Sequence, residues 1–300
     1  MRPVARHERR RVLLGTSAAL LSPWLRPWVA SGAPPADGLA PALAEVSAVE
    51  RTLGGRVGLC ALDTGSGARL AHRADERFAM CSTFKVLLAA AVLARVDRGA
   101  EQLAALLNFT AEDLLPYAPF VRAHLQEGAL SVGALAEASV EVSDNTAANL
   151  LLRRLGGPAA LTRYLRGIGD VPSRLDRNEP ALNTNLSGDQ RDTTTPDAMV
   201  ATLHTILLGT VLAADSRQRL LLWMRNGKTG LRRLRAGLPA EWSAGDKTGT
   251  GKNGSANDVA IVWPPGRAPI LVAAYLSGSK LAAEALDAAH ARLGAIIARM

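Results

Sequence analysis

The sequence has few aromatic residues, few histidines and few cysteines. Aromatic residues make up 4% of the 300 residues and hydrophobic residues 48%, so we expect an aliphatic core rich in helices. The five histidines are scattered and form neither an HxH nor an HExxH pattern. This argues against a catalytic zinc site, and we expect no metal and no cofactor. The only cysteines are Cys60 and Cys81, for which two buried free thiols are the favoured interpretation.

Beyond its first 33 residues the chain also lacks a strong excess of charge. Residues 1–33 contribute +5 to the net charge of +8, through six arginines and Glu8, so the remaining chain carries +3. The densest basic stretch there is 231–235, with three arginines, which is typical of a solvated face. No run of Lys and Arg is long enough to bind a phosphate backbone, and we expect no nucleic-acid partner.

Residues 1–33 have the organisation of an export signal. Arg9, Arg10 and Arg11 precede the apolar stretch 12–21, which is too short and too interrupted by Gly and Ser to span a bilayer. The pattern resembles a twin-arginine signal, with cleavage expected near residues 30–33; the alternative is a disordered basic tail. Since no later segment is long and apolar enough for a membrane helix, we expect a periplasmic mature protein without a membrane partner.

Periodicity and turn residues divide the rest of the chain into strands and helices. Helical spacing is present over 39–53, 82–96, 131–138, 145–155, 196–208 and 281–297. Strand patterns cover 57–62, 69–72, 245–251, 259–263 and 270–276. The stretch 173–195 has little apolar periodicity and is predicted to be a long loop, a kind of segment that often carries function.

The strands thus lie at the two ends of the sequence, and the helices lie between them. This order predicts an α+β fold, with one antiparallel sheet flanked by the terminal helices and an inserted all-helical lobe. Within a domain spanning 34–300, the α/β lobe would take about 34–73 and 225–300. The helical lobe would take about 74–224.

Four short motifs follow one another in the chain. They are Ser82-Thr83-Phe84-Lys85, Ser143-Asp144-Asn145, Glu179-Pro180-Ala181-Leu182-Asn183 and Lys247-Thr248-Gly249. Ser82 and Lys85 are three residues apart and share one face of a helix. A serine needs a nearby base to become a nucleophile, and a lysine can serve if burial or nearby cations lower its pKa. Taken alone, the pair could be a helix cap and a surface lysine, and Ser143-Asp144-Asn145 a helix start.

The four motifs together resemble those of the class A serine β-lactamases over roughly residues 40–298. The resemblance implies that Ser82 is acylated by the β-lactam with Lys85 at hand as a base. Ser143 would pass a proton to the leaving nitrogen, and Glu179 would activate the water that clears the acyl-enzyme. The implied function is hydrolysis of penicillins and cephalosporins, and hence antibiotic resistance, by a monomer that binds only this small molecule.

The same resemblance implies further site residues. The backbone N–H groups of Ser82 and Thr250 would form the oxyanion hole. An ion pair between Arg177 and Asp192 would close the long loop. The residues implied in substrate binding are Tyr117, Asn145, Asn183, Arg233, Lys247, Thr248, Gly249 and Thr250.

Two positions depart from the pattern of many family members. Many members have an arginine shortly after Lys-Thr-Gly that binds the substrate carboxylate, and Ala256 stands there instead. We assign that role to Arg233, at a position where other members supply the guanidinium from a different strand. Cys81 precedes the nucleophile as in the disulfide-bearing carbapenemases, but Gly251 stands where they have the partner cysteine, so that bridge cannot form.

Two other functions share most of these motifs. A D-alanyl-D-alanine carboxypeptidase or transpeptidase, or a β-lactam sensor that acylates without hydrolysis, would also have a Ser-x-x-Lys and a Lys-Thr-Gly element. Glu179 with Asn183 argues against both, because such proteins lack this water-activating pair. Asp63-Thr64-Gly65 also matches the aspartic-protease tripeptide, but it occurs once, and that chemistry needs two facing carboxylates.

Overall fold

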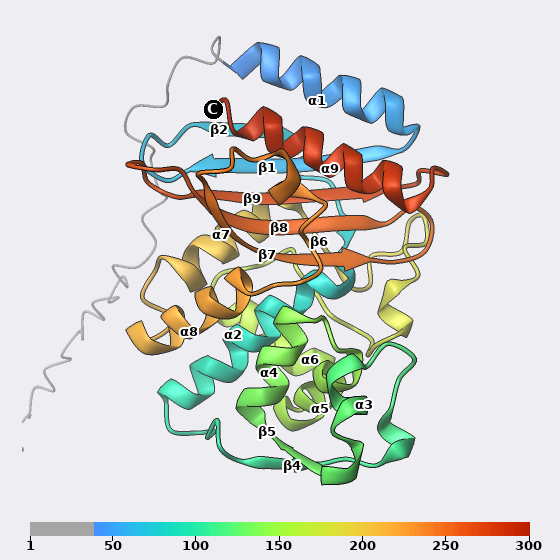
Figure 1. The fold of residues 1–300 in the computed structure, drawn as a ribbon, viewed down its shortest axis with the longest axis vertical. Coiled ribbons are helices and arrows are strands. Elements are labelled where there is room, and N and C mark those ends of the chain that lie inside the picture. The colour runs from blue at the N-terminus through green and yellow to red at the C-terminus, as the bar shows by residue number, and fades with distance from the viewer. Residues whose placement is uncertain (1–38) are drawn as a thin grey trace, which may run out of the picture. The chain divides into compact units, whose positions relative to one another are not determined.

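The computed structural model describes residues 39–300, so the predicted export signal at 1–33 lies outside the described residues. A five-stranded antiparallel sheet has the order β2-β1-β9-β8-β7 (Figure 1). Its strands are β1 (Arg56–Asp63), β2 (Arg69–His72), β7 (Ser243–Thr250), β8 (Ala256–Trp263) and β9 (Ile270–Ser277). Strand β1 lies in register with β9, so the two ends of the described chain share one sheet, and β7 is left as an edge strand.

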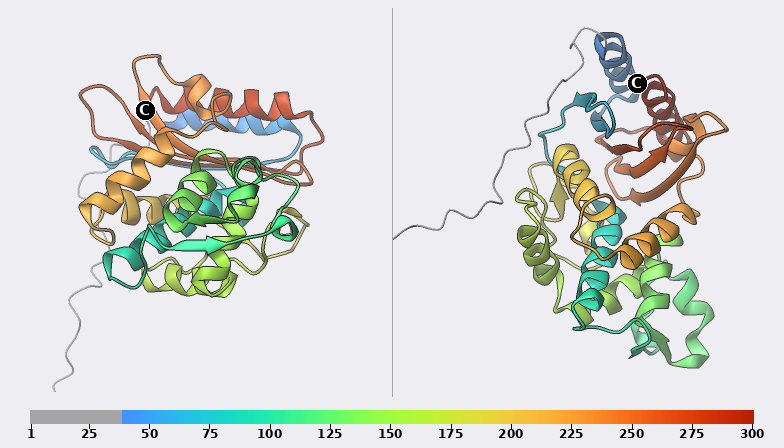
Figure 2. Two further views of the ribbon diagram at one scale, coloured as in Figure 1. Left: turned by 60° about the horizontal axis from the view of Figure 1, so that its bottom comes forward. Right: turned by 90° about the vertical axis from the view of Figure 1, so that its left-hand side faces the viewer.

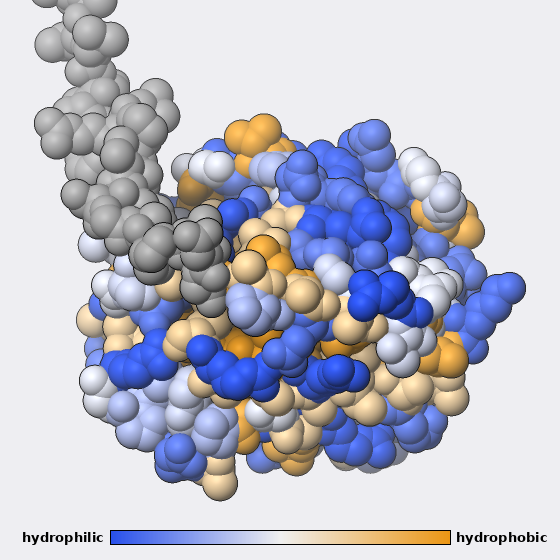
Figure 3. Space-filling model, turned by 90° about the horizontal axis from the view of Figure 1, so that it is seen from above, coloured by the Kyte–Doolittle hydropathy of each residue, from blue (hydrophilic) through white to orange (hydrophobic). Residues whose placement is uncertain are grey.

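Two helices cover one face of this sheet. Helix α1 (Ala40–Leu53) and helix α9 (Ala283–Ile297) lie side by side over it (Figures 1 and 2). Helix α1 ends where Gly54 adopts φ = 64°, a left-handed conformation that glycine reaches without steric cost. Figure 3 looks onto this side of the molecule and shows hydrophilic residues interspersed with small groups of hydrophobic ones.

The other face of the sheet packs on the helical part of the chain. The helices here are α2 (Phe84–Asp97), α3 (Pro119–Ala123), α4 (Val132–Glu141), α5 (Asn145–Leu155), α6 (Pro158–Gly167), α7 (Pro196–Leu207) and α8 (Ala214–Arg225). Helix α2 is buried on all sides from Phe84 to Ala94, which matches its almost unbroken apolar sequence. It therefore forms the centre of the larger hydrophobic core.

The predicted α+β fold with an antiparallel sheet is confirmed. Several details differ, and the helices α3, α6 and α8 were not predicted individually. The segment predicted as one helix from residue 82 begins with a 3-10 turn, Cys81–Thr83, and α2 itself starts at Phe84. The predicted loop 173–195 contains a 3-10 turn (Ala181–Asn183) and the strand β6 (Thr193–Thr194), which pairs with β3 (Phe78–Ala79). A second short pair, β4 (Leu106–Asn108) with β5 (Ala129–Ser131), was also not predicted, because two or three residues show no periodicity.

No helix within residues 39–300 combines the length and the hydropathy needed to cross a membrane.

Helix α9 and the 3-10 turn η6 (Leu234–Gly237) approach each other at two glycines, Gly294 on the helix and Gly237 on the turn. A Cβ atom added at Gly294 would lie 2.2 Å from the backbone oxygen of Leu234, and one added at Gly237 would lie 1.7 Å from the backbone oxygen of Ala291. The two backbones can approach this closely only without side chains. This contact fixes the position of the residue just before η6, which is Arg233.

We expect Gly294→Ala to lower the free energy of unfolding by about 1–3 kcal/mol, the usual cost of overpacking, although alanine favours helix. The matched control is Gly167→Ala. Gly167 lies in the last turn of α6, as Gly294 lies in the last turn of α9, but a Cβ atom at Gly167 would face open space. That variant should be unchanged or more stable by up to about 1 kcal/mol. Urea unfolding of both variants tests this, and equal stability of the two would contradict the close contact.

Candidate active site

The motif residues come together where the edge strand β7 passes the first turn of α2. Ser82 lies in the 3-10 turn before α2, Lys85 in the first turn of α2, and Ser143 just before α5. Ser82 and Ser143 line a cavity of about 330 Å³, and Lys85 lies behind them. The cavity walls are formed by Ser82, Tyr117, Ser143, Asn145, Asn183, Thr229, Arg233, Thr248 and Thr250.

One carboxylate oxygen connects the serine and the lysine. The Ser82 hydroxyl donates to Oε1 of Glu179 over 3.2 Å, and Lys85 Nζ lies 3.2 Å from the same oxygen. The side chains of Lys85 and Glu179 are both fully buried. A potential nucleophile therefore contacts one potential base directly, and the second, Lys85, contacts the same carboxylate oxygen.

The amino group of Lys85 is buried and has several partners. Burial lowers its pKa, while the carboxylates of Glu179 and Asp144 oppose this shift. Nζ donates to the backbone oxygen of Ser143 over 2.8 Å and to Oδ1 of Asn145 over 2.5 Å. These contacts connect α2 to the start of α5.

Ser143 stands between two lysines. Its Oγ lies 3.0 Å from Nζ of Lys247 and 3.3 Å from Nζ of Lys85. Burial, together with the charge of Lys85, lowers the pKa of Lys247 to about 7. The Ser143 backbone has φ = 59°, an uncommon conformation outside glycine that is often found at functional sites.

The middle residue of Ser143-Asp144-Asn145 supports this arrangement. The Asp144 carboxylate accepts the N–H of Ala147 and so caps α5, as expected for a helix start. Its other oxygen accepts two N–H groups from the first turn of α3. The N–H of Asn145 donates to the carbonyl of Tyr117, whose half-exposed side chain lies at the rim of the cavity.

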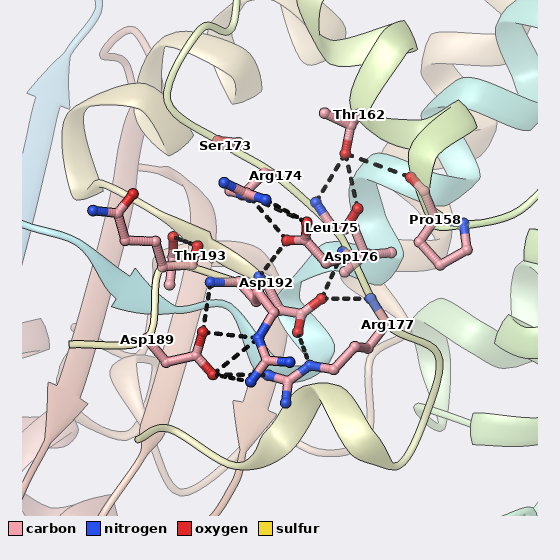
Figure 4. Close-up of polar contacts among 12 residues, drawn as sticks. Pro158, Thr162, Ser173, Arg174, Leu175, Asp176, Arg177, Asp189, Asp192 and Thr193 are labelled. Carbon is pink, nitrogen blue, oxygen red and sulfur yellow. Dashed lines mark hydrogen bonds and ion pairs between the residues drawn. The ribbon is translucent and has the colours of Figure 1, made fainter. Parts of the chain in front are cut away.

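The long loop is closed by buried charges. Nε of Arg177 donates to Oδ2 of Asp192 over 2.5 Å, and Oδ1 of Asp192 accepts the N–H groups of Asp176 and Arg177 (Figure 4). Asp192 is fully buried. The predicted pair thus comes together at the base of the loop that carries Glu179. Asp176, which the motifs did not indicate, accepts the N–H of Asp192 in return.

Asn149 holds the backbone of Glu179 and was missed from the sequence. Its Oδ1 accepts the N–H of Glu179 over 3.0 Å, and its Nδ2 donates to the carbonyl of Glu179 over 2.9 Å. The Glu179 side chain is held separately, by Nδ2 of Asn183, 2.5 Å from Oε2. The one available signal was that Asn149 lies one helical turn after Asn145.

Arg233 lies on a turn before η6. The side chain is nearly buried, and its N–H groups are largely engaged. Nε donates to Asp287, Nη1 to the backbone oxygens of Gly249 and Asn257, and Nη2 to Oγ1 of Thr250 over 2.8 Å. Arg233 thus connects α9 to the end of β7.

Gly249 lets β7 approach the turn that carries Ser82. A Cβ atom there would lie 2.7 Å from the backbone oxygen of Met80 and 3.1 Å from Cβ of Cys81. Any side chain at this position would push the strand away from the serine.

A larger hollow of about 730 Å³ lies between the long loop and the ends of β1 and β9. Its charged side chains pair among themselves or with their surroundings, as in Arg56 with Glu76 and Arg191 with Asp189. It contains none of the motif side chains that surround Ser82.

Comparison with known proteins identifies the family. A model of the β-lactamase enzyme family matches residues 39–300. The carbapenem-hydrolysing β-lactamase KPC of Klebsiella oxytoca is 48% identical over 82% of this chain and 85% of its own length. The β-lactamase L2 of Stenotrophomonas maltophilia is 44% identical over 97% of this chain and 98% of its own length. The solved structure of a class A β-lactamase reconstructed for the last common ancestor of Gram-negative bacteria has a TM-score of 0.85 and 56% identity, over 86% of this chain and 98% of its own.

The chain belongs to the class A serine β-lactamases. The enzyme is therefore a β-lactam hydrolase that acts on a small-molecule substrate. The alternatives of a carboxypeptidase and of a sensor without hydrolysis lose their support.

Both cysteines of this β-lactamase are buried free thiols, as predicted. Burial raises the pKa of each to about 12. Sγ of Cys81 lies 3.3 Å from Oγ of Ser255, and a Cβ atom added at Gly251 would lie 2.7 Å from that sulfur. Gly251 thus leaves Cys81 unpaired although the two positions are adjacent.

We expect Asn149→Ala to loosen the loop 173–195, because the N–H and carbonyl of Glu179 would lose both partners. A buried polar group without a partner costs about 1–3 kcal/mol. Amide hydrogen exchange across the loop should become faster while α1 and α9 keep their protection. The control is Asn226→Ala, which removes only an exposed bond to Glu141. Unchanged exchange in the loop of Asn149→Ala would contradict the role of Asn149.

Proposed function

We propose that the enzyme hydrolyses penicillins and cephalosporins through an acyl-enzyme on Ser82, and that Glu179 activates the water that clears it. The observation that supports this most directly is the contact of one Glu179 oxygen with both Ser82 Oγ and Lys85 Nζ, each over 3.2 Å. A nucleophile beside a buried base is the arrangement that covalent catalysis needs.

In the acylation step, Ser82 Oγ attacks the β-lactam carbonyl carbon and gives its proton to Lys85 or Glu179. The backbone N–H groups of Ser82 and Thr250 would stabilise the negative oxygen that forms. The carbon–nitrogen bond then breaks, and the Ser143 hydroxyl passes its proton to the nitrogen while it takes one from Lys85. The proton that left Ser82 is thus transferred in effect to the nitrogen, and Lys85 and Glu179 return to their starting states. The contacts of Ser143 with both lysines support this relay.

In the deacylation step, a water molecule adds to the ester carbon as Glu179 takes its proton. The bond to Ser82 Oγ breaks, and the proton returns to that oxygen. Asn183 would hold the water together with Glu179, and its bond to Oε2 keeps the carboxylate in place. Asn149 and the Arg177–Asp192 pair would act indirectly, by holding the loop.

Penicillins and cephalosporins carry a carboxylate beside the ring nitrogen, and the end of β7 is suited to bind it. Lys247 would supply positive charge, and the hydroxyls of Thr248 and Thr250 would donate hydrogen bonds. Arg233 would add charge and support Thr250, to which it donates. Asn145 would bind the side-chain amide of the substrate, and Tyr117 would contact it at the rim.

We also propose that residues 1–33 direct export through the twin-arginine route, so that the mature monomer works in the periplasm and confers β-lactam resistance. The supporting observation is the order of basic, apolar and small residues in this segment. A separate proposal concerns the lobes of the mature enzyme. The active site around Ser82 would lie between an α/β lobe, formed by about 34–73 and 225–300, and a helical lobe, formed by about 74–224.

Glu179→Gln should separate the two halves of the reaction. Ser82 and Lys85 remain, so acylation should continue, whereas deacylation loses a base worth typically 10²- to 10⁴-fold in rate. A penicillin adduct should accumulate on Ser82 in intact-protein mass spectrometry while turnover falls by about that factor. Wild-type turnover would refute the role of Glu179 in deacylation, and absence of any adduct would show that acylation needs it too.

The pH dependence should report Lys247. Its pKa is lowered to about 7 by burial, so its charge is present below that pH and is lost as the pH rises through it. Because the neutral amine no longer attracts a carboxylate, we expect kcat/KM to fall above about pH 7. In Lys247→Arg the guanidinium keeps its charge, so the fall should move to higher pH whatever the absolute rate. An identical alkaline limb in both proteins would assign it to another group.

A further inference from the structure

Thr229 lines the active-site cavity but belongs to none of the motifs. It lies on the turn between α8 and η6, and its Oγ1 is 2.6 Å from Oγ1 of Thr248. Thr248 is one of the two hydroxyl residues at the carboxylate end of the cavity. The pair therefore connects this turn directly to substrate binding.

The turn that carries Thr229 is firmly held. The N–H of Lys228 donates to the carbonyl of Glu141 over 2.8 Å, and the N–H of Arg233 donates to the carbonyl of Gly230 over 2.9 Å. Gly230 lies against β7 so closely that a Cβ atom there would be 1.8 Å from the carboxylate of Asp246. Thr229 is thus fixed from both sides by contacts to α4 and β7.

The direction of the bond between the two hydroxyls follows from proton counting. A hydroxyl has one proton to donate and two lone pairs. If Thr248 donates its proton to an anion, it has none left for Thr229, so Thr229 must be the donor. The neighbouring hydroxyl, Thr250, already has this arrangement, since Arg233 can only donate to it. Thr248 and Thr250 would then each accept a hydrogen bond from the protein, and each would keep its own proton for the substrate.

We propose that Thr229 is a positioning residue for carboxylate recognition, whose hydroxyl donates to Thr248 and thereby points the Thr248 proton at the substrate carboxylate. This rests on the proposed binding of the carboxylate at the end of β7. Successive hydrogen bonds in one direction polarise each other, so a donor behind Thr248 also strengthens the bond to the anion.

The test compares a cephalosporin acid with its uncharged ester in wild type and in Thr229→Val, which keeps the shape and removes the hydroxyl. We expect KM for the acid to rise about two- to tenfold, the usual value of one hydrogen bond, with little change in kcat. KM for the ester should stay the same, and Thr229→Ser should have the wild-type KM for the acid. The control is Thr205→Val, whose hydroxyl only binds the carbonyl of Ala201 on α7. An unchanged KM for the acid in Thr229→Val, or equal losses for acid and ester, would overturn the proposal.

A double-mutant cycle separates positioning from direct contact. If Thr229 acts through Thr248, then adding Thr229→Val to Thr248→Val should raise KM for the acid no further. If KM for the acid rises in the double variant by the product of the two separate factors, Thr229 contacts the substrate itself, and the positioning role is overturned. The wild type tests the underlying assumption on its own, because equal KM for acid and ester would refute carboxylate binding whatever Thr229 does.

Discussion

The buried amino group of Lys85 is the feature on which the rest of the site depends. A charge removed from water costs several kcal/mol unless other groups replace the lost hydration. Here the replacements are the carbonyl of Ser143, the amide oxygen of Asn145 and the carboxylate of Glu179. These groups come from the start of α5 and from the long loop. Both segments must therefore fold against α2 before Lys85 can be buried at acceptable cost.

The same requirement explains why several buried contacts hold the loop 173–195 in place. Glu179 can meet Lys85 only if the loop keeps its shape, and two of the loop's side chains, Leu175 and Leu182, are buried in the hydrophobic core. Buried Asp192 holds the base of the loop, and Asn149 holds the backbone at Glu179 itself. The loop is thus ordered by two buried leucines together with polar contacts at a few defined points.

The opposite side of the site depends on close backbone contacts. Gly249 brings β7 next to the turn of Ser82, and Gly294 brings α9 next to η6. The second contact lies some distance from the cavity, yet it sets Arg233 and, through it, Thr250. Positions that carry no side chain at all thus determine where the polar side chains stand.

The sequence predicts the long elements and the order of the motifs well, because each depends on local periodicity or on a short pattern. The strands around 270–276 and the helix from residue 82 are examples. Asn149 and Thr229 could not be predicted, since each is a single polar residue whose partner lies far along the chain. The surroundings of Arg233 could not be predicted for the same reason. The turn that carries it is fixed by Glu141 and Asp287, which no local pattern around residue 233 reveals.

Two nucleophilic side chains stand next to each other in this chain, Cys81 and Ser82, and the intrinsically stronger one is the thiol. Yet Cys81 is fully buried and its pKa is raised to about 12, so the thiolate is absent at any physiological pH. Thiol reagents and oxidants act on the thiolate and need access to it, and here they have neither. In the proposed mechanism the chemistry therefore belongs to the weaker nucleophile, because its neighbour is buried, and we expect Cys81 to resist oxidation.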